Sequence, residues 1–440
     1  MRRIKAELIV FMVFVGAVIL SDVNFETMTM RANAATLYVG GSNPGNYSNI
    51  QDAITAAAAD STIYVYTGTY DENLFIDKTL TLMGENKYTT VINTTGHTYG
   101  IEVSNIDYVN ISGFTVLGAN ACNIKLTSSN HSHIHGNILK EGGFFGLGLS
   151  SCYFNLIEEN DITENLDGVT LSSSSKSNIL RYNTITISNG KMIPDTRAIH
   201  IDTDSDDNLL LGNIISGHNI SVYIKESLNC HMENNQISDC IEGLRMFDQS
   251  SGELKGNTIS NAEVGVWILE DTSATLENCT IENIDTYSLR LGDEVWKDAD
   301  VTLINTTFDT TKVNIIDDES SLMVNWYLHV KIVDEASRPV AGISVRVKDN
   351  PNGSFDEDYS SNSEGFVRWI VLAQFSQNRT GRVYFTPYNI TVYNTSSLGY
   401  ARPEVMMDKS KEITITTYSD SDGDGVFDIN DAFPDEPTQW

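Results

Sequence analysis

The chain has 440 residues, five cysteines and a formal net charge of −31 at pH 7. Its length leaves room for two or three domains. Proteins that bind nucleic acids neutralise phosphates with lysine and arginine, so the acidic balance of this chain argues against that class. The same balance favours a soluble chain that attracts cations.

The N-terminus has the pattern of a secretory signal. A basic start, Met1–Lys5, precedes an apolar run over residues 8–20, which is too short for a typical membrane span. Ala32-Asn33-Ala34 offers a cleavage site, so we assign residues 1–35 to a signal peptide, with an uncleaved N-terminal anchor as the alternative. Eleven Asn-x-Ser/Thr sequons agree with export, although a repeat rich in Asn and Thr also produces them freely. We expect a secreted or cell-surface glycoprotein without any other membrane segment.

A short helix is expected before the repeats begin. Ser48-Asn49-Ile50-Gln51 has the pattern of a capping box, in which Ser48 caps the helix and Gln51 reaches back to its start. The helix, from about Asn49 to Ala59, is expected to cover the open end of the repeats, because bare terminal strands pair readily with other chains.

A triplet that ends in an apolar residue recurs at a nearly fixed spacing. Most copies read Asn-x-aliphatic, and the nine copies begin at Phe114, Asn137, Asn160, Asn183, Asn213, Asn235, Asn257, Cys279 and Thr306. The intervals are 23, 23, 23, 30, 22, 22, 22 and 27 residues. Within each repeat, short strands such as Val169-Thr170-Leu171 alternate with period two. Such a repeat indicates a solenoid, and we predict an all-β fold with a three-sided parallel β-helix over residues 36–315.

The first coil resembles that of the right-handed parallel β-helix proteins. Tyr47–Ile54 and Tyr64–Asn73 match the opening of the NosD-like secreted and surface proteins of archaeal type, and the chain is more distantly similar to pectate lyases and polygalacturonases. The resemblance covers residues 37–315 and implies a right-handed β-helix. It indicates little about activity, because a fold does not define a function.

Residues 316–418 differ in character from the repeats. Asp317–Ser321 indicates a linker, and strands such as Leu328–Asp334 and Glu412–Thr416 predict a small antiparallel β-sandwich. This part resembles the carboxypeptidase-regulatory-like or Ig-like modules that surface proteins carry as spacers.

Residues 419–440 contain an acidic loop with the spacing of a calcium site. Counted as twelve residues from Asp420, the loop has carboxylates at positions 1, 3, 5, 9 and 12 and glycine at position 6. Ca²⁺ prefers six to eight oxygen ligands, and the glycine permits a sharp turn. We expect calcium as a cofactor, with a disordered acidic tail as the alternative; Ala432–Pro437 makes the loop similar to thrombospondin type 3 repeats. The expected ligands are Asp420, Asp422, Asp424, Asp428 and Asp431.

A candidate binding face follows from the strand alternation. One outward position in successive coils, about 4.8 Å apart, is occupied by His200, Tyr223, Arg245, Trp267 and Arg290. Flat rings suit sugar rings, and arginine suits the carboxylates of acidic sugars. The long intervals add loops near residues 189–197 and 293–300 that bracket this face, although an ordinary solvated face is the competing interpretation. A neighbouring register holds carboxylates that repel one another unless cations lie among them: Glu226, Asp248, Glu270 and Asp293.

Three histidines form a second candidate site. If Ile134 points inward, then His131, His133 and His135 face outward on one strand, and imidazole binds copper, nickel or zinc. Alternate residues of a strand lie about 6.7 Å apart, which is wide for one ion. An exposed triplet that binds no metal is therefore the alternative.

Two residue types are expected to be structural. The repeated asparagines should stack at turns and bond successive backbones, as in other cross-strand ladders. The cysteines share no register on adjacent coils, so free, buried thiols are expected; they are Cys122, Cys152, Cys230, Cys240 and Cys279.

No known enzyme signature is present, and Asp206-Asp207 is the nearest fragment of the polygalacturonase motifs. We therefore favour a non-catalytic exported β-helix protein that binds polysaccharide or a cell-envelope partner. One alternative is a polysaccharide lyase or glycosidase in the His200–Arg290 groove, with Glu226 and Asp248 as a carboxylate pair or Arg245 as a base. Another is a NosD-like metal-handling accessory protein that uses the three histidines.

Overall fold

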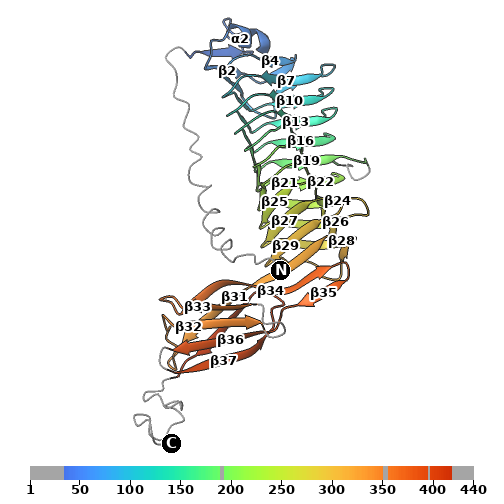
Figure 1. Ribbon diagram of the computed structural model, residues 1–440. Coiled ribbons are helices and arrows are strands. Elements are labelled where there is room, and N and C mark those ends of the chain that lie inside the picture. The colour runs from blue at the N-terminus through green and yellow to red at the C-terminus, as the bar shows by residue number, and fades with distance from the viewer. Residues whose placement is uncertain (1–33, 189–192, 350–354, 395–396, 419–440) are drawn as a thin grey trace, which may run out of the picture.

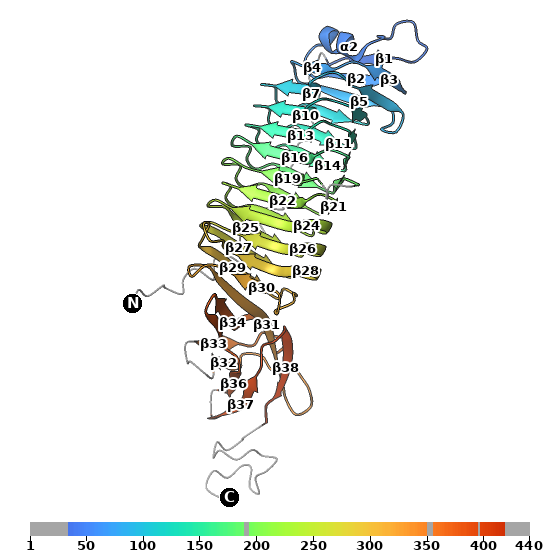
Figure 2. The ribbon, with the colours of Figure 1, turned by 90° about the vertical axis from the view of Figure 1, so that its right-hand side faces the viewer.

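The computed structural model describes residues 34–188, 193–349, 355–394 and 397–418. It shows an elongated column of stacked strands with a small helix at one end and an antiparallel unit at the other (Figures 1 and 2). The predicted fold class, a parallel β-helix followed by a small antiparallel β-sandwich, is confirmed. The predicted signal peptide lies outside the described residues except for Ala34 and Ala35. Within those ranges, no helix has the length and apolar character needed to cross a membrane.

One side of the column is a sheet of 16 strands that continues beyond the repeats. Its strands are β1 (Thr36–Val39), β2 (Ser61–Val65), β5 (Leu80–Gly84), β8 (Asn110–Ser112), β11 (His133–His135), β14 (Leu156–Glu158), β17 (Ile179–Arg181), β20 (Leu209–Leu211), β23 (Cys230–Glu233), β25 (Ser251–Lys255), β27 (Thr272–Glu277), β29 (Ala299–Ile304), β31 (Ser321–Val333), β34 (Phe366–Asn378), β35 (Gly381–Tyr384) and β38 (Lys411–Thr416). They pair in that order, except that β38 pairs with β31. The pairing is parallel as far as β31 and antiparallel between β31 and β34.

The other two sides form a sheet of 18 strands. They merge at β24, which pairs with both β21 and β22. The strands are β3 (Gly68–Asp71), β4 (Leu74–Ile76), β6 (Thr90–Asn93), β7 (Tyr99–Ser104), β9 (Thr115–Leu117), β10 (Cys122–Thr127), β12 (Ile138–Lys140), β13 (Phe145–Ser150), β15 (Asp161–Thr163), β16 (Asp167–Ser172), β18 (Thr184–Thr186), β19 (Arg197–Ile201), β21 (Ile214–Ser216), β22 (Ile220–Lys225), β24 (Gln236–Phe247), β26 (Thr258–Ile268), β28 (Thr280–Leu291) and β30 (Val313–Ile315).

The period-two pattern places apolar residues in continuous columns inside the solenoid. In β7, Ile101 and Val103 are fully buried, while Glu102 between them faces outward. Ile101 pairs with Ile124 of the next coil. Each strand therefore buries one face against its own coil and stacks its side chains on those of the coils before and after it.

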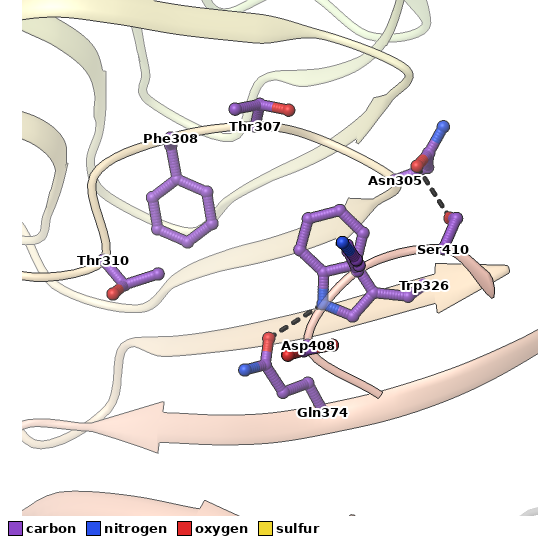
Figure 3. A pocket seen from close by; sticks show the side chains of 9 residues that line it. Asn305, Thr307, Phe308, Thr310, Trp326, Gln374, Asp408 and Ser410 are labelled. Carbon is purple, nitrogen blue, oxygen red and sulfur yellow. Dashed lines mark hydrogen bonds between the residues drawn. The ribbon is translucent and has the colours of Figure 1, made fainter. Parts of the chain in front are cut away.

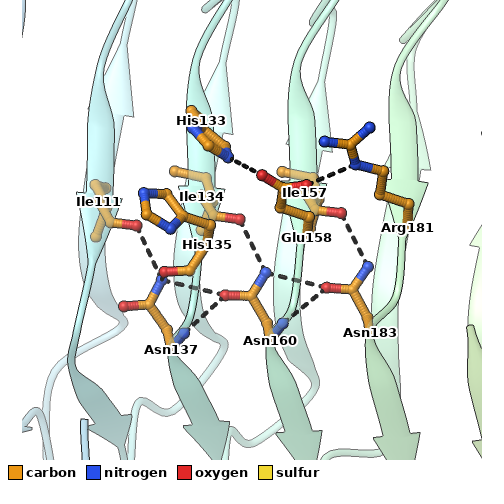
Figure 4. A network of polar contacts seen from close by, with 10 residues as sticks. All are labelled: Ile111, His133, Ile134, His135, Asn137, Ile157, Glu158, Asn160, Arg181 and Asn183. Carbon is orange, nitrogen blue, oxygen red and sulfur yellow. Dashed lines mark hydrogen bonds and ion pairs between the residues drawn. The ribbon is translucent and has the colours of Figure 1, made fainter. Parts of the chain in front are cut away.

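The asparagines of the repeated triplets occupy the same turn in successive coils, and they form a buried ladder of hydrogen bonds from coil to coil (Figure 4). The backbone N–H and Nδ2 of Asn137 donate to Oδ1 of Asn160 at 3.0 and 3.2 Å, and Asn160 donates in the same way to Asn183 at 3.1 and 3.1 Å. Nδ2 of Asn160 also donates to the carbonyl of Ile134 at 2.9 Å. The structural role expected for these asparagines is confirmed. The pattern continues through Asn213, Asn235 and Asn257.

Two further hydrogen-bond ladders, which were not predicted, run from coil to coil at a different turn of each coil. Asn155 donates its backbone N–H to Oδ1 of Asn178 at 3.0 Å, and Asn178 donates to Asn208 at 2.8 Å. Hydroxyl groups act in the same way in the second of these ladders, where each backbone N–H donates to the side chain one coil further on. Its members include Ser175, Ser205, Ser227, Ser250 and Thr272.

The helix α2 (Ile50–Ala56) packs Ile50, Ala53 and Ile54 against the first coil. The capping-box prediction is wrong, because Asn49 is the N-cap residue and its side chain makes no capping hydrogen bond. The carboxylate of Glu72 accepts from the backbone N–H groups of Ile50 at 2.7 Å and Gln51 at 3.0 Å instead. A carboxylate serves here better than a hydroxyl group, since it is charged and lies at the positive end of the helix dipole.

All five cysteines are buried and form no disulfide, as predicted. Burial raises the pKa of the thiols of Cys122 and Cys230 to about 12. Both thiols are therefore protonated at neutral pH, and they pack as small apolar groups.

The sandwich joins the β-helix through a shared strand. Asp317, at the start of the predicted linker, is buried and accepts hydrogen bonds from the backbone of Glu319 and Ser320 in a tight turn. Directly after this turn, β31 begins with Ser321 paired to Asp300 of the last long coil strand. Opposite β31 and β34 lies a second sheet of four strands in the order β33-β32-β36-β37. These are β32 (Ser344–Asp349), β33 (Asp356–Ser360), β36 (Tyr388–Asn394) and β37 (Ser397–Val405).

We expect Asn160→Ala to lower the free energy of unfolding by about 2–4 kcal/mol, because it leaves buried donors and acceptors without partners in three coils. Asn43→Ala, at an exposed loop position, is the matched control and should change stability by less than about 0.5 kcal/mol. Unfolding in guanidinium chloride measures both. Equal unfolding midpoints for the two variants would show that the asparagine ladder contributes no net stability.

Candidate functional site

The predicted binding face is a single column on the outer surface of the 18-stranded sheet. We call this column the ladder, as distinct from the asparagine ladder inside the solenoid. Strand pairing places its members side by side in coil order: His200, Tyr223, Arg245, Trp267 and Arg290. Val266 and Ile268, on either side of Trp267, are fully buried. The predicted inward and outward register is therefore correct.

Trp267 is held between two guanidinium groups. Cζ of Arg245 lies 4.5 Å from the centroid of the indole ring, and Cζ of Arg290 lies 3.8 Å from it. The two arginines come from the coils before and after Trp267, and both lie over its indole ring. Trp267 therefore positions both guanidinium groups.

A buried carboxyl group lies beside the ladder. Glu242 is 6% exposed, and its Oε1 accepts a hydrogen bond from Nη2 of Arg245. The other oxygen, Oε2, has no hydrogen-bond partner among the described residues. Burial raises the pKa of Glu242, and the positive charge of Arg245 offsets this effect only in part. A buried acid with a raised pKa beside a cation is frequent at functional sites, although structural ion pairs also produce it.

His200 lies between two carboxylates. Its Nδ1 is 3.5 Å from Oδ2 of Asp167, and its Nε2 is 3.1 Å from Oδ2 of Asp202. Burial alone would lower the pKa of His200, but the hydrogen bonds with the two carboxylates outweigh burial and raise it. The ring of His200 also packs edge-on against Tyr223, with centroids 5.0 Å apart.

Arg197 adds a third guanidinium group to this face. Its Cζ lies 4.6 Å from the ring centroid of Tyr223, and its backbone N–H donates to Asp167 at 2.9 Å. Sequence reasoning missed Arg197, Asp167 and Glu242. Each stands three residues before the ladder position of its own strand, and strand pairing stacks Arg197 directly on Asp167. This constant offset of three residues from the ladder position is the sequence signal that could have identified them.

One lysine neutralises part of the acidic register. Nζ of Lys225 is 2.6 Å from Oε1 of Glu226 and 3.4 Å from Oδ2 of Asp248. The hydrogen bond from Lys225 lowers the pKa of Glu226, whereas burial and the charge of Asp248 raise the pKa of Glu270. Glu226 is therefore ionised at neutral pH, which does not suit it as a general acid.

The second predicted loop brings an aromatic residue towards the ladder. Trp296 is 45% exposed, and its ring lies 6.5 Å from that of Phe247, which in turn lies 5.3 Å from Tyr223. Part of the first loop, residues 189–192, lies outside the described residues. Aromatic contacts thus connect the 293–300 loop with the middle of the ladder.

The three histidines are not together on one strand, which corrects that expectation. Ile134 is buried as predicted, and His133 and His135 stack with ring centroids 4.1 Å apart. His131, however, lies in a turn with a φ of 54°, and its ring stacks between Tyr108 and Phe154. The left-handed backbone at this position turns its side chain away from the outward face of β11.

The metal site that the NosD resemblance suggests does not fit these histidines. His133 bonds to Glu158 at 2.7 Å, and Arg181 donates to the same carboxylate at 2.6 Å (Figure 4). Burial would raise the pKa of Glu158, but these bonds outweigh burial and lower it. Across the described ranges, no group of three or more His, Cys, Asp or Glu side chains is arranged to hold a metal ion. The expected calcium ligands, from Asp420 to Asp431, lie outside the described residues.

Comparisons with protein families agree with the architecture. Residues 54–196 match the family described as periplasmic copper-binding protein (NosD), and residues 197–365 match the right-handed β-helix region. The two matches are contiguous and together span most of the solenoid and the start of the sandwich. No curated protein matches the chain.

Several solved structures are similar to the chain. The polygalacturonase from Erwinia carotovora ssp. carotovora has a TM-score of 0.54 and 12% identity, over 67% of this chain and 98% of that chain. The alginate lyase from Paenibacillus sp. has a TM-score of 0.43 and 17% identity, over 64% and 99% of the two chains. The thermostable α-1,3-glucanase from Streptomyces thermodiastaticus has a TM-score of 0.46 and 14% identity, over 66% and 69%. Likeness at these identities concerns the fold alone. The chain is a right-handed β-helix protein whose residues 54–196 resemble the NosD family.

Two histidines, the buried His218 and the partly buried His200, should change stability with pH in opposite directions. The raised pKa of His200 adds stability below pH about 6.5, and this is lost as pH rises through the folded pKa. Burial lowers the pKa of His218 to about 4, so stability falls as pH drops below about 6.5. We expect His200→Gln to lose stability mainly at acidic pH, whereas His218→Gln should be less sensitive to acid than the wild type.

Melting temperatures between pH 4 and pH 8 measure both effects, with His97→Gln at an exposed position as the control. Parallel profiles for His200→Gln and His218→Gln would contradict the assigned charge states.

Proposed function

We propose that the chain is an exported β-helix protein that binds acidic polysaccharide along the ladder without cleaving it. The sequence pattern of the N-terminus and the periplasmic family matched by residues 54–196 support export. The binding role rests on the chemistry of the ladder face. It also fits a fold whose outward columns are straight and long enough to follow a polymer.

The observation that carries this proposal is a set of three oriented guanidinium groups with donors to spare. A guanidinium group has five N–H donors. Arg245 gives one hydrogen bond to Glu242, while Arg197 and Arg290 make only long ion-pair contacts of 3.7 Å with Asp167 and Asp293. Stacking on aromatic rings already fixes these groups, so little side-chain freedom is lost when an anion binds.

The spacing of these groups suits a repeating anion. Arg245 and Arg290 belong to coils two steps apart, which places them about 10 Å from one another along the column. A polymer that lies parallel to the column axis meets them in succession. Since the chain as a whole carries a net charge of −31, a polyanion is repelled elsewhere on the surface and is held only where cations are concentrated.

The double variant Arg245→Gln/Arg290→Gln should weaken binding to polygalacturonate by at least about tenfold, which corresponds to about 1.4 kcal/mol. The control is Arg338→Gln/Arg379→Gln, which removes the same charge from exposed positions of the sandwich. Affinity electrophoresis in gels that contain polygalacturonate, alginate or neutral dextran compares the variants. The proposal fails if the two double variants migrate alike, or if dextran retards the wild type as strongly as the acidic polymers.

One observation favours a second candidate, an acidic-polysaccharide lyase or hydrolase on the same face. Glu242 is a buried acid with a raised pKa next to Arg245. A carboxyl group of this kind supplies or takes a proton in general acid–base catalysis. It is a better candidate for that role than Glu226, whose pKa is lowered.

Incubation of the wild type with polygalacturonate and alginate separates binding from cleavage. The binding proposal expects no unsaturated or new reducing ends. The enzyme alternative expects product that Glu242→Gln reduces by about 100-fold or more, while Glu226→Gln, an exposed residue of the acidic register, retains most of the activity.

A further inference from the structure

A cavity lies where the last coil of the β-helix meets the sandwich (Figure 3). Its volume is about 510 Å³, which lies in the range of about 300–1,000 Å³ typical of small-ligand pockets. Its lining comes from residues 305–310 of the coil, Trp326 of β31, Gln374 of β34 and the turn at residues 408–410. It shares no residue with the ladder, and it combines residues of both domains.

Two aromatic side chains form its apolar walls. Figure 3 shows the ring of Phe308 and the indole of Trp326 facing the same space. Trp326 is 8% exposed, and its indole N–H donates to Oε1 of Gln374 at 2.8 Å. This hydrogen bond fixes the indole plane, and it leaves the amide Nε2 of Gln374 available as a donor.

Polar groups surround these rings. Oγ of Ser410 accepts from the backbone N–H of Tyr327 at 2.9 Å and donates to Asn305 at 2.7 Å. Nζ of Lys411 lies 2.7 Å from Oδ1 of Asp408, and this hydrogen bond lowers the pKa of the carboxyl group. Asp408 is therefore an ionised acceptor at neutral pH.

Contacts across the junction hold the cavity in shape. Arg382 of β35 donates to the carbonyl of Thr310, and Arg379 pairs with Asp318 at 3.2 Å. The hydroxyl group of Tyr327 donates to Glu277 of β27 at 2.5 Å. The sandwich is thus tied to the last coils on several sides of the cavity, which favours a preformed site.

This lining has the chemistry that recognises a sugar ring. Aromatic faces cover its C–H surfaces, while a carboxylate, amides and hydroxyl groups bond its hydroxyls. The lining holds one carboxylate, Asp408, which pairs with Lys411, and one ammonium group, Lys409, so no single charge is concentrated there to select an ionic ligand. We propose that the junction cavity binds one neutral sugar residue, either free or at the end of a glycan. This site is independent of the ladder.

Saturation-transfer NMR on the full chain tests this site, with methyl glycosides of glucose, galactose, mannose and N-acetylglucosamine and the matching disaccharides as probes. The protein should come from a host that does not N-glycosylate, because Asn305 begins a sequon. We expect transfer to at least one glycoside. Thr310→Trp, which fills the cavity, should abolish it, and Asp408→Asn should weaken binding about tenfold through loss of a charged hydrogen bond.

The matched controls are Thr414→Trp and Glu412→Gln, at exposed positions of β38; these and Arg245→Gln/Arg290→Gln should leave the transfer unchanged. If Thr310→Trp lowers the melting temperature, then the result for Asp408→Asn alone decides whether the proposal holds. Transfer concentrated on the terminal residue of a disaccharide identifies a glycan end as the ligand, whereas transfer to monosaccharides only identifies a free sugar. The proposal is overturned if no probe shows transfer, if Asp408→Asn binds like Glu412→Gln, or if the ladder variant loses the signal.

Discussion

At each inner turn of this solenoid a buried backbone N–H group points along the column axis towards the next coil. Left without a partner, each such group would cost about 1–3 kcal/mol. Asparagine solves the problem because its side-chain amide accepts bonds through Oδ1 and donates bonds through Nδ2, so the same side chain receives bonds from one coil and passes one on to the next. The series begins with the N–H of Phe114, which donates to Asn137, and it extends to Thr306, whose hydroxyl group accepts from the N–H of Cys279. The step between coils, and with it the stacking of every side chain, depends on this repeated bond.

A fixed step has a consequence for the outer surface. Because the inward residues and the turns maintain the coil, outward positions are free to vary without loss of the fold. The ladder uses that freedom: Arg245, Trp267 and Arg290 come from successive coils, and the step brings their side chains into cation–π contact. The same regularity places Glu242 and Arg197 at one constant offset from the ladder. A site assembled in this way is rigid because its scaffold is periodic.

The repeat, its register and the stacking of the asparagines could be predicted from the sequence, since each depends on spacing and alternation alone. Contacts that depend on side-chain conformation or on distant partners could not. Glu72 caps the helix from 22 residues away, and the local capping box gave no sign of it. The prediction that His131 faces outward beside His133 and His135 was wrong for a related reason. The left-handed backbone at His131 breaks the alternation that holds for the other two histidines. The spacing of Trp267 placed it in the right column but did not show that arginines cover its ring.

The strand β31 belongs to both domains, and this has a mechanical consequence. Its first residues pair in parallel with β29 and its later residues with β38, while β34 pairs with it along most of its length. A pull on the sandwich along this strand loads the hydrogen bonds to β29 in shear, so many must fail together rather than one after another. The molecule therefore transmits tension as a single rod rather than as two bodies on a hinge, and a polymer held on its side would be anchored at a constant distance from whatever fixes its end.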